Sequence, residues 1–313
     1  MALPEVIDVH VHLTRDPAQE RIVFPKPGYP DEWYRANEPR VLDWMDDEGV
    51  SHLFMINYMD TNRMIASRLA RMPDASEAEL EGAREQLREE HVERLRRFNA
   101  WCCELGAREP RLIPFPCVDI GIFYDVTVMM EELETRLADG ARGIKLHPGL
   151  GHYFPGDERM FPLYERLQEA DVPVLSDTGS LSAAPAGGVY GEPLNFVPVF
   201  EQFPRLRFIM AHAASAFWDE RVPIAERFPQ VYFDLAGGFQ GPGHHARDGH
   251  RACPIEDAPR FLRALGIERV LWASDAPGHE AGPQLRRFMS IPLSDAERER
   301  ILAKNAREFI GLD

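Results

Sequence analysis

Short apolar runs that alternate with amphipathic segments constrain the fold of this 313-residue chain more than any other feature. Eight runs rich in β-branched residues predict strands, at residues 6–13, 51–58, 112–119, 141–147, 172–178, 206–213, 231–236 and 270–275. Segments with the helical period of 3.6 residues follow them, at residues 39–48, 76–105, 126–139, 161–170, 195–202, 217–228, 255–265 and 294–310. This alternation predicts a parallel sheet covered by helices.

A closed (β/α)8 barrel of the TIM type is the simplest α/β arrangement of these elements, and such barrels use about 250 residues or more in one domain. An open doubly wound sheet is the alternative, but no glycine-rich turn follows the first strand. We therefore expect a single barrel domain over residues 1–313, with insertions at about 13–37, 60–100, 179–193 and 237–253. We expect these insertions at the carboxyl ends of the strands, where barrel active sites lie.

The composition argues against several classes of partner. The chain has 35 Lys and Arg residues against 51 Asp and Glu residues, a net charge of −16, whereas binding to a nucleic-acid backbone requires clustered basic residues. No apolar run approaches the roughly 18 residues that span a bilayer, and the first residues lack the basic stretch of a signal peptide. We expect a cytoplasmic protein with a small-molecule ligand and with no nucleic-acid or membrane partner.

Ionisable side chains recur where the predicted strands end. In the first strand, Asp8, His10 and His12 share one face by the two-residue period. Later strands end in Lys145 and His147, in Asp177, in His212 and in Asp275. Each of these residues alone has an ordinary structural explanation, such as a helix cap or a satisfied core histidine. Together they would crowd many ionisable groups around one apolar mouth, where unpaired charge is costly, so the set favours a bound cation.

A divalent ion could be held by His10, His12 and one or both of Asp177 and Asp275, with a position left open for water. An open position is typical of catalytic rather than structural metal sites. Such an ion can lower the pKa of a bound water molecule from about 15.7 to about 7, which makes hydrolysis feasible at neutral pH. We expect one divalent ion, with zinc as the first choice and manganese as the alternative.

The run Asp8-Val9-His10-Val11-His12 resembles the opening signature of the amidohydrolase superfamily. Residues 143–148, 210–213, 273–277 and 305–309 resemble its amidohydrolase-related branch, which contains metal-dependent hydrolases together with decarboxylases of the aminocarboxymuconate-semialdehyde and resorcylate kinds. The resemblance runs in order from residue 6 to residue 312. It implies a distorted (β/α)8 barrel, usually one metal ion, and commonly a homodimer.

The resemblance also implies roles for individual residues. His10 and His12 would be metal ligands from the first strand, and Asp275 would ligate the metal or carry a proton. His212 would polarise or protonate the substrate. Lys145 matches a lysine that related branches carboxylate to bridge two metals, and here we expect it to be uncarboxylated and part of the catalytic group.

Asp177 departs from the pattern, because relatives usually carry a histidine at this position. If Asp177 is a ligand, two carboxylates and two imidazoles leave a divalent centre neutral, which favours a harder ion such as manganese. If it is too short, the third ligand would be His147 or a histidine of the 237–253 loop. We also expect His147 to line the substrate pocket. Arg247 and Arg251 of that loop could pair with a substrate carboxylate, although a solvated loop explains them equally well.

The sequence leaves three functions open. The first choice is a metal-dependent hydrolase of a small carboxylic-acid, amide or ester-like substrate, in which metal-activated water attacks and Asp275 transfers a proton. The second is a non-oxidative decarboxylase of an aromatic or dienyl acid, in which Asp275 or His212 protonates the carbon. The third is a barrel that has lost its metal and only binds a ligand. The substrate itself is not predicted, because specificity depends on the inserted loops.

Overall fold

The structure is a computed structural model that describes residues 4–28, 30–178, 188–239 and 252–312. Its strands form two parallel sheets, with the orders β1-β2-β3 and β4-β5-β6-β7-β8. The strands are β1 (Val6–Val11), β2 (Val50–Ile56), β3 (Leu112–Phe115), β4 (Ile144–Leu146), β5 (Val174–Ser176), β6 (Phe208–Met210), β7 (Val231–Asp234) and β8 (Val270–Leu271). All eight lie where the apolar runs predicted them, and each is shorter than its run.

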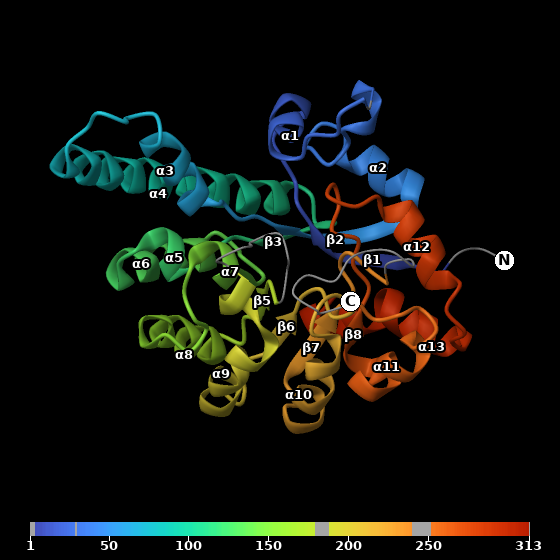
Figure 1. Cartoon of the computed structure of the whole chain (residues 1–313). Helices are drawn as coiled ribbons and strands as arrows, with labels where there is room; N and C mark the ends of the chain where they lie inside the picture. The colour runs from blue at the N-terminus through green and yellow to red at the C-terminus, as the bar shows by residue number, and fades with distance from the viewer. Residues whose placement is uncertain (1–3, 29, 179–187, 240–251, 313) are drawn as a thin grey trace.

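Two parallel bridges join these sheets into one ring. Cys117, just after β3, pairs with Lys145 of β4, and Val11 of β1 pairs with Ala276 after β8. The His12 N–H also donates to the Ala276 carbonyl oxygen at 2.7 Å. Figure 1 shows the strands at the centre of the molecule with helices around them. The expected TIM-type barrel is therefore confirmed.

Helices cover the outside of the ring, most of them where the 3.6-residue period predicted. They are α1 (Pro17–Val23), α2 (Val41–Glu48), α3 (Thr61–Leu69), α4 (Glu77–Arg108), α5 (Ile120–Phe123), α6 (Val126–Ala138), α7 (Pro148–Gly151), α8 (Phe161–Glu169), α9 (Val197–Gln202), α10 (Arg221–Arg227), α11 (Ala258–Leu265), α12 (Ala281–Met289), α13 (Asp295–Glu299) and α14 (Asn305–Ile310). Helix α4 begins at a capping box, in which Ser76 and Glu79 bond each other's backbone N–H groups. None of the helices in the described ranges combines the length and apolar character needed to cross a membrane.

The C-terminal segment departs from the single helix expected at 294–310. It divides into α13, the π-helical turn η8 (Arg300–Lys304) and α14, and it covers the amino ends of the strands. Arg307 of α14 pairs with Glu5 ahead of β1 at 2.7 Å, and Arg142 ahead of β4 donates to the Ile310 carbonyl oxygen at 2.5 Å. An apolar cluster of strand residues that includes Ile7, Val9, Phe54, Phe115 and Ile209 packs against this segment. The amino end of the barrel is therefore closed, and the site must open at the other end.

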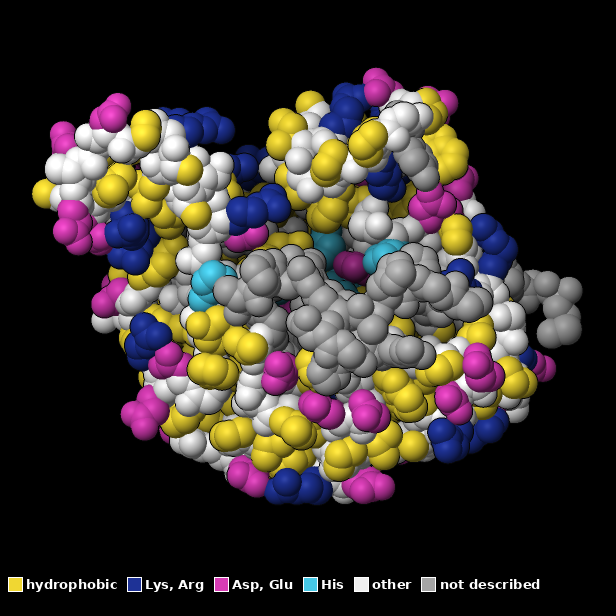
Figure 2. Space-filling model, in the orientation of Figure 1, with side chains coloured by type: hydrophobic (Ala, Val, Ile, Leu, Met, Phe, Trp, Pro, Cys, Tyr) yellow, Lys and Arg dark blue, Asp and Glu magenta, His cyan; other side chains and the backbone are white. Residues whose placement is uncertain are grey.

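Helix α12 was not predicted, because Gly282 and Pro283 in its first turn are residues that usually argue against a helix. Both residues disfavour a helix interior, yet a first turn tolerates them because its N–H groups have no intrahelical partner. At the carboxyl ends of the strands, the insertion after β1 carries α1, and the insertion after β2 carries α3 and the start of α4. Figure 2 shows a hollow between these two groups of helices, with histidine and acidic side chains at its base.

Candidate metal centre

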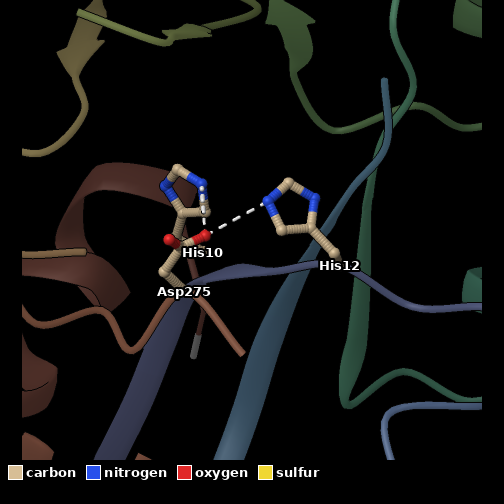
Figure 3. A group of neighbouring side chains, drawn as sticks. All are labelled: His10, His12 and Asp275. Atoms are coloured by element: carbon tan, nitrogen blue, oxygen red, sulfur yellow. Dashed lines mark ion pairs between the residues drawn. The ribbon is translucent and has the colours of Figure 1, made fainter. Parts of the chain in front are cut away.

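Two histidines from β1 and the segment after it, and one aspartate after β8, form a compact group of candidate metal ligands, which we name the ligand group (Figure 3). One ligand atom from each of His10, His12 and Asp275 lies within 4.8 Å of the other two. His12 Nε2 is 3.2 Å from Asp275 Oδ1, and His10 Nε2 is 3.6 Å from the same oxygen. Two imidazoles and one carboxylate are ligands that suit zinc and manganese. The residues therefore fit a divalent ion.

The end of β1 is not a regular strand. Its pairing with β2 shifts register between Asp8 and Val11, so the simple two-residue alternation does not hold through His10 and His12. The two imidazole rings nevertheless lie 5.3 Å apart, nearly perpendicular to each other. Since strands of a barrel converge at their carboxyl ends, a local irregularity here still delivers both rings to one point.

Asp234, the last residue of β7, fixes the orientation of His10. Its Oδ2 lies 2.9 Å from His10 Nδ1, and its Oδ1 accepts the N–H groups of His212 at 2.9 Å and Ala236 at 3.0 Å. Burial lowers the pKa of His10 well below its usual value, so the ring is neutral and carries one proton. If Asp234 is ionised, it can only accept a hydrogen bond from Nδ1, which would leave the Nε2 lone pair facing Asp275. Asp234 was not among the residues predicted from the sequence, although it is an acidic residue at a strand end like Asp177 and Asp275.

Asp177 lies directly after β5 and pairs with two histidines. Its Oδ2 is 3.2 Å from His212 Nε2 and 3.5 Å from His147 Nε2. Burial opposes ionisation, but the two histidines keep the pKa of Asp177 well below its usual range. Within the described part of the chain, Asp177 lies outside the ligand group. Asp177 is thus paired with His212 and His147, and its expected role as a metal ligand stays a prediction.

His212, two residues after β6, has an acceptor at each ring nitrogen. Nδ1 lies 3.2 Å from the Ala236 carbonyl oxygen, and Nε2 lies 3.2 Å from Asp177 Oδ2. Neither oxygen can donate, so both nitrogens carry protons and the ring is a cation. Burial opposes this charge, but the hydrogen bond and the charge of Asp177 raise the pKa of His212 to about 9. The ring centre lies 4.9 Å from that of His10, so the cation is adjacent to the ligand group.

Two of these residues have an unusual backbone conformation. His212 has a φ of 59° and Asp275 a φ of 65°, in the left-handed region that non-glycine residues seldom adopt. Such residues cost on the order of 1–3 kcal/mol and are concentrated at functional sites. Hydrogen bonds hold both in place, from the His212 N–H to Asp234 Oδ1 at 2.9 Å and from the Asp275 N–H to the His10 carbonyl oxygen at 3.0 Å.

Lys145 and His147 both lie within the barrel mouth and are almost fully buried. Burial lowers the pKa of Lys145, while the charges of nearby carboxylates act in the opposite direction. His147 Nδ1 accepts the Leu150 N–H at 3.3 Å, so this histidine caps the first turn of α7. Burial lowers the pKa of His147 to about 4, and its Nε2 faces Asp177.

Three residues that were not predicted from the sequence surround His12 and Asp275. Phe24, from the insertion after β1, stacks on His12 with ring centres 5.6 Å apart. Tyr58, after β2, meets His12 edge-on at 5.0 Å. His279 Nε2 lies 3.7 Å from Asp275 Oδ2. These contacts depend on how the insertions fold over the barrel, which the periodic pattern of apolar residues does not predict.

Three further expectations concern residues around this group. Arg247 and Arg251, expected to bind a substrate carboxylate, lie outside the described residues, so these roles stay predictions. The histidines of the same loop, considered as alternative third ligands, also lie outside them. His147, the other alternative, contacts Asp177 instead of joining the ligand group.

Comparison with known protein families covers almost the whole chain. Residues 7–312 match the amidohydrolase family. This chain belongs to that family. The resemblance inferred from the strand-end motifs is therefore confirmed, and the protein is an enzyme of the amidohydrolase superfamily.

Curated relatives match this amidohydrolase over only part of their length. Human sorting nexin-33 is 27% identical over 149 residues, which cover 48% of this chain and 24% of that protein. A 2-keto-4-carboxy-3-hexenedioate hydratase from Sphingobium is 28% identical over 219 residues, which cover 60% of this chain and 63% of that protein. The chain therefore spans less than two thirds of either relative.

Solved structures match this amidohydrolase over its full length. An uncharacterized TIM-barrel protein from Bordetella bronchiseptica has a TM-score of 0.69, with 17% identity and 98% of each chain covered. A 2,6-dihydroxybenzoate decarboxylase from Rhizobium has a TM-score of 0.66, with 18% identity and 100% of each chain covered. A dihydroxybenzoic acid decarboxylase from Polaromonas with bound manganese and 2-nitroresorcinol has a TM-score of 0.64, with 16% identity and coverage of 99% of this chain and 98% of that chain. At such identity these structures show the shared fold.

Proposed function

We propose that this amidohydrolase-family enzyme is a metal-dependent lyase that decarboxylates a small aromatic or unsaturated carboxylic acid. The observation that carries this proposal is the His212 cation, held by Asp177 beside the ligand group. This pair keeps one transferable proton next to the place where a divalent ion would bind. The similar proteins support the reaction class, because two of the solved structures are named as decarboxylases.

The charges around the ligand group favour an anionic substrate. Lys145 of β4 and His212 after β6 are both basic side chains directed into the barrel mouth region, and both are surrounded by carboxylates. A bound divalent ion would add positive charge. A substrate carboxylate would be stabilised by these cations, because opposite charges attract strongly where water is largely excluded.

The reaction needs one proton and releases one carbon dioxide. A divalent ion, when bound, would stabilise negative charge that develops on the substrate oxygens. The bond from the carboxyl carbon to the neighbouring carbon breaks, and that neighbouring carbon keeps the electron pair and takes a proton from His212 Nε2. The neutral imidazole then has an Nε2 lone pair facing the ionised carboxylate of Asp177, and this repulsion favours its reprotonation from solvent.

Hydrolysis, the first choice from the sequence, is the second candidate. Asp275 favours it, because an ionised carboxylate beside His12 can accept a proton from an attacking water molecule. Burial opposes ionisation of this residue, but the hydrogen bond from His12 and the charge of His212 keep the pKa of Asp275 well below its usual range. The description of the family as amidohydrolase agrees with this candidate as well.

Product analysis separates the two candidates. The enzyme with added manganese or zinc would be incubated with 2,6-dihydroxybenzoate, 5-carboxyvanillate and 2-keto-4-carboxy-3-hexenedioate, in water enriched in ¹⁸O or in deuterium oxide. Decarboxylation predicts release of carbon dioxide and one deuterium on the product carbon, and loss of both in His212→Gln. A product that gains ¹⁸O without carbon dioxide would refute the decarboxylase proposal and support a hydrolase or hydratase.

We retain zinc as the first expected ion, because a site with two imidazoles and one carboxylate is common for zinc. Manganese stays the alternative, and the manganese-bound decarboxylase from Polaromonas supports it. If neither zinc nor manganese binds, the third function, a barrel that binds a ligand without a metal, is supported instead. The homodimer and the cytoplasmic location expected from the sequence stay predictions.

A further inference from the structure

We propose that Asp234 is a positioning residue that holds His10 in the tautomer able to bind a divalent ion. This inference rests on the metal binding that the proposed function requires. Asp234 of β7 would thus support a metal centre whose ligands lie on β1 and on the segments that follow β1 and β8. Asp234 contacts no ligand position itself and acts through His10 and through the backbone of His212.

Two backbone N–H groups and one ring nitrogen surround the carboxylate of Asp234. The side chain has 0% exposure. Oδ2 lies 2.9 Å from His10 Nδ1, while Oδ1 accepts the backbone N–H of His212 at 2.9 Å and that of Ala236 at 3.0 Å. Among the described residues two backbone N–H groups thus donate to Asp234, and in its ionised form the carboxylate can only accept a hydrogen bond from His10 Nδ1.

This arrangement decides where the single proton of a neutral His10 ring lies. With the proton on Nδ1, the ring donates to Asp234 and presents the Nε2 lone pair, which lies 3.6 Å from Asp275 Oδ1 within the ligand group. With the proton on Nε2, a lone pair would face the carboxylate of Asp234 and an N–H would occupy the ligand position. Carboxylate partners of metal-binding histidines fix the tautomer in this way.

The same carboxylate also anchors the cation beside the ligand group. Its Oδ1 binds the N–H of His212, whose backbone turns into the left-handed region there. Asp234 therefore contacts both His10, a candidate metal ligand, and His212, the proposed proton donor. A change at Asp234 is expected to disturb both, with metal affinity as the more direct measure.

Asp234→Asn preserves the size of the side chain but cannot satisfy all three donors. If the amide oxygen accepts from His212 and Ala236, the amide NH2 faces His10 Nδ1 and stabilises the proton on Nε2. If the amide is flipped, its NH2 faces two backbone N–H groups. Both orientations oppose the arrangement seen in the structure, so the variant should lose metal affinity.

Glu132→Gln is the matched control. Glu132 of α6 is also a buried carboxylate, accepts a hydrogen bond from Asn99 at 3.0 Å and pairs with Arg136 at 3.3 Å, but it lies outside the ligand group. Zinc dissociation constants would be measured by competition with a chromophoric chelator. We expect Asp234→Asn to bind zinc about 10–100-fold more weakly than the wild type, and Glu132→Gln to bind it unchanged. Equal affinity in Asp234→Asn and the wild type overturns the inference, whereas a wild type that binds neither zinc nor manganese overturns the proposed function.

A second measurement reads the His10 tautomer in the wild type, and a variant serves only to assign the signals. Histidine ¹⁵N chemical shifts of the metal-free protein report which ring nitrogen is protonated, and the His10 signals are assigned by their loss in His10→Asn. We expect His10 with its proton on Nδ1. A proton on Nε2 overturns the inference.

Discussion

Replacing Asp177 with asparagine should remove the charge that keeps His212 protonated. Asp177 Oδ2 lies 3.2 Å from His212 Nε2, and Asp177 is the main group that raises the pKa of this imidazole from 6.5 to about 9. That rise of roughly 2.5 pKa units corresponds to about 3 kcal/mol in favour of the protonated form, at about 1.36 kcal/mol per unit. Because burial alone opposes the charge, we expect the pKa of His212 in the variant to fall to about 6.5 or below.

The sign of the effect on stability follows from the raised pKa. A histidine with a higher pKa in the folded state contributes stability that is fully present below about pH 6.5 and is lost as the pH rises through about 9. The stability advantage of the metal-free wild type over Asp177→Asn should therefore shrink by up to about 3 kcal/mol between pH 6.5 and pH 9. Urea unfolding of chelator-treated protein at several pH values measures this difference.

A double-mutant cycle isolates the pair. In a His212→Gln background, Asp177→Asn should show no such dependence on pH, because the titrating partner is absent. Histidine ring titration by NMR gives the pKa of His212 directly in both the wild type and Asp177→Asn. An unchanged pKa of His212, or a stability difference that stays constant from pH 6.5 to pH 9, would refute the reasoning.

Two further predictions concern the barrel that supports the site. Burial raises the pKa of Asp119 from 3.8 to about 6, so the stability that its protonated form contributes is lost as the pH rises through about 6. Between pH 4 and pH 8 the free energy of unfolding of Asp119→Asn, measured in urea, should therefore rise by up to about 3 kcal/mol relative to that of the wild type. A difference between the two proteins that is the same at both pH values would contradict this. Gly143→Ala should lower the free energy of unfolding by about 1–3 kcal/mol, because its Cβ would lie 2.0 Å from Phe115 Cε1. Gly82→Ala on α4 is the control and should be neutral or stabilising, because its Cβ would have nothing within 4 Å. Similar thermal midpoints for the two variants would contradict this.

The sequence predicted the barrel well because strand and helix periods are local signals. The carboxyl ends of parallel barrel strands converge, so His10, His12 and Asp275 could be placed together without knowledge of any side-chain contact. Asp234 ends β7 and could have been predicted in the same way. It was missed because a single buried aspartate inside an apolar run gives no motif of its own.

Pairings between side chains could not be predicted in the same way. Whether Asp177 reaches His10 or His212 depends on differences of a few ångströms between neighbouring strand ends, which the sequence does not encode locally. The irregular end of β1 and the left-handed turns at His212 and Asp275 also arise from contacts between distant segments. Helix α12 was hidden by Gly282 and Pro283, since only the fold shows that they occupy a first turn.

Metal content tests the central claim most directly, namely that His10, His12 and Asp275 share one divalent ion. Zinc and manganese would be counted per chain after purification without chelator and dialysis against each ion, for the wild type, His10→Ala, Asp275→Ala and the control Glu132→Gln. The account predicts about one ion per chain in the wild type and the control, and a marked loss in His10→Ala and Asp275→Ala. Equal metal content in all four proteins, or none in the wild type, would contradict it.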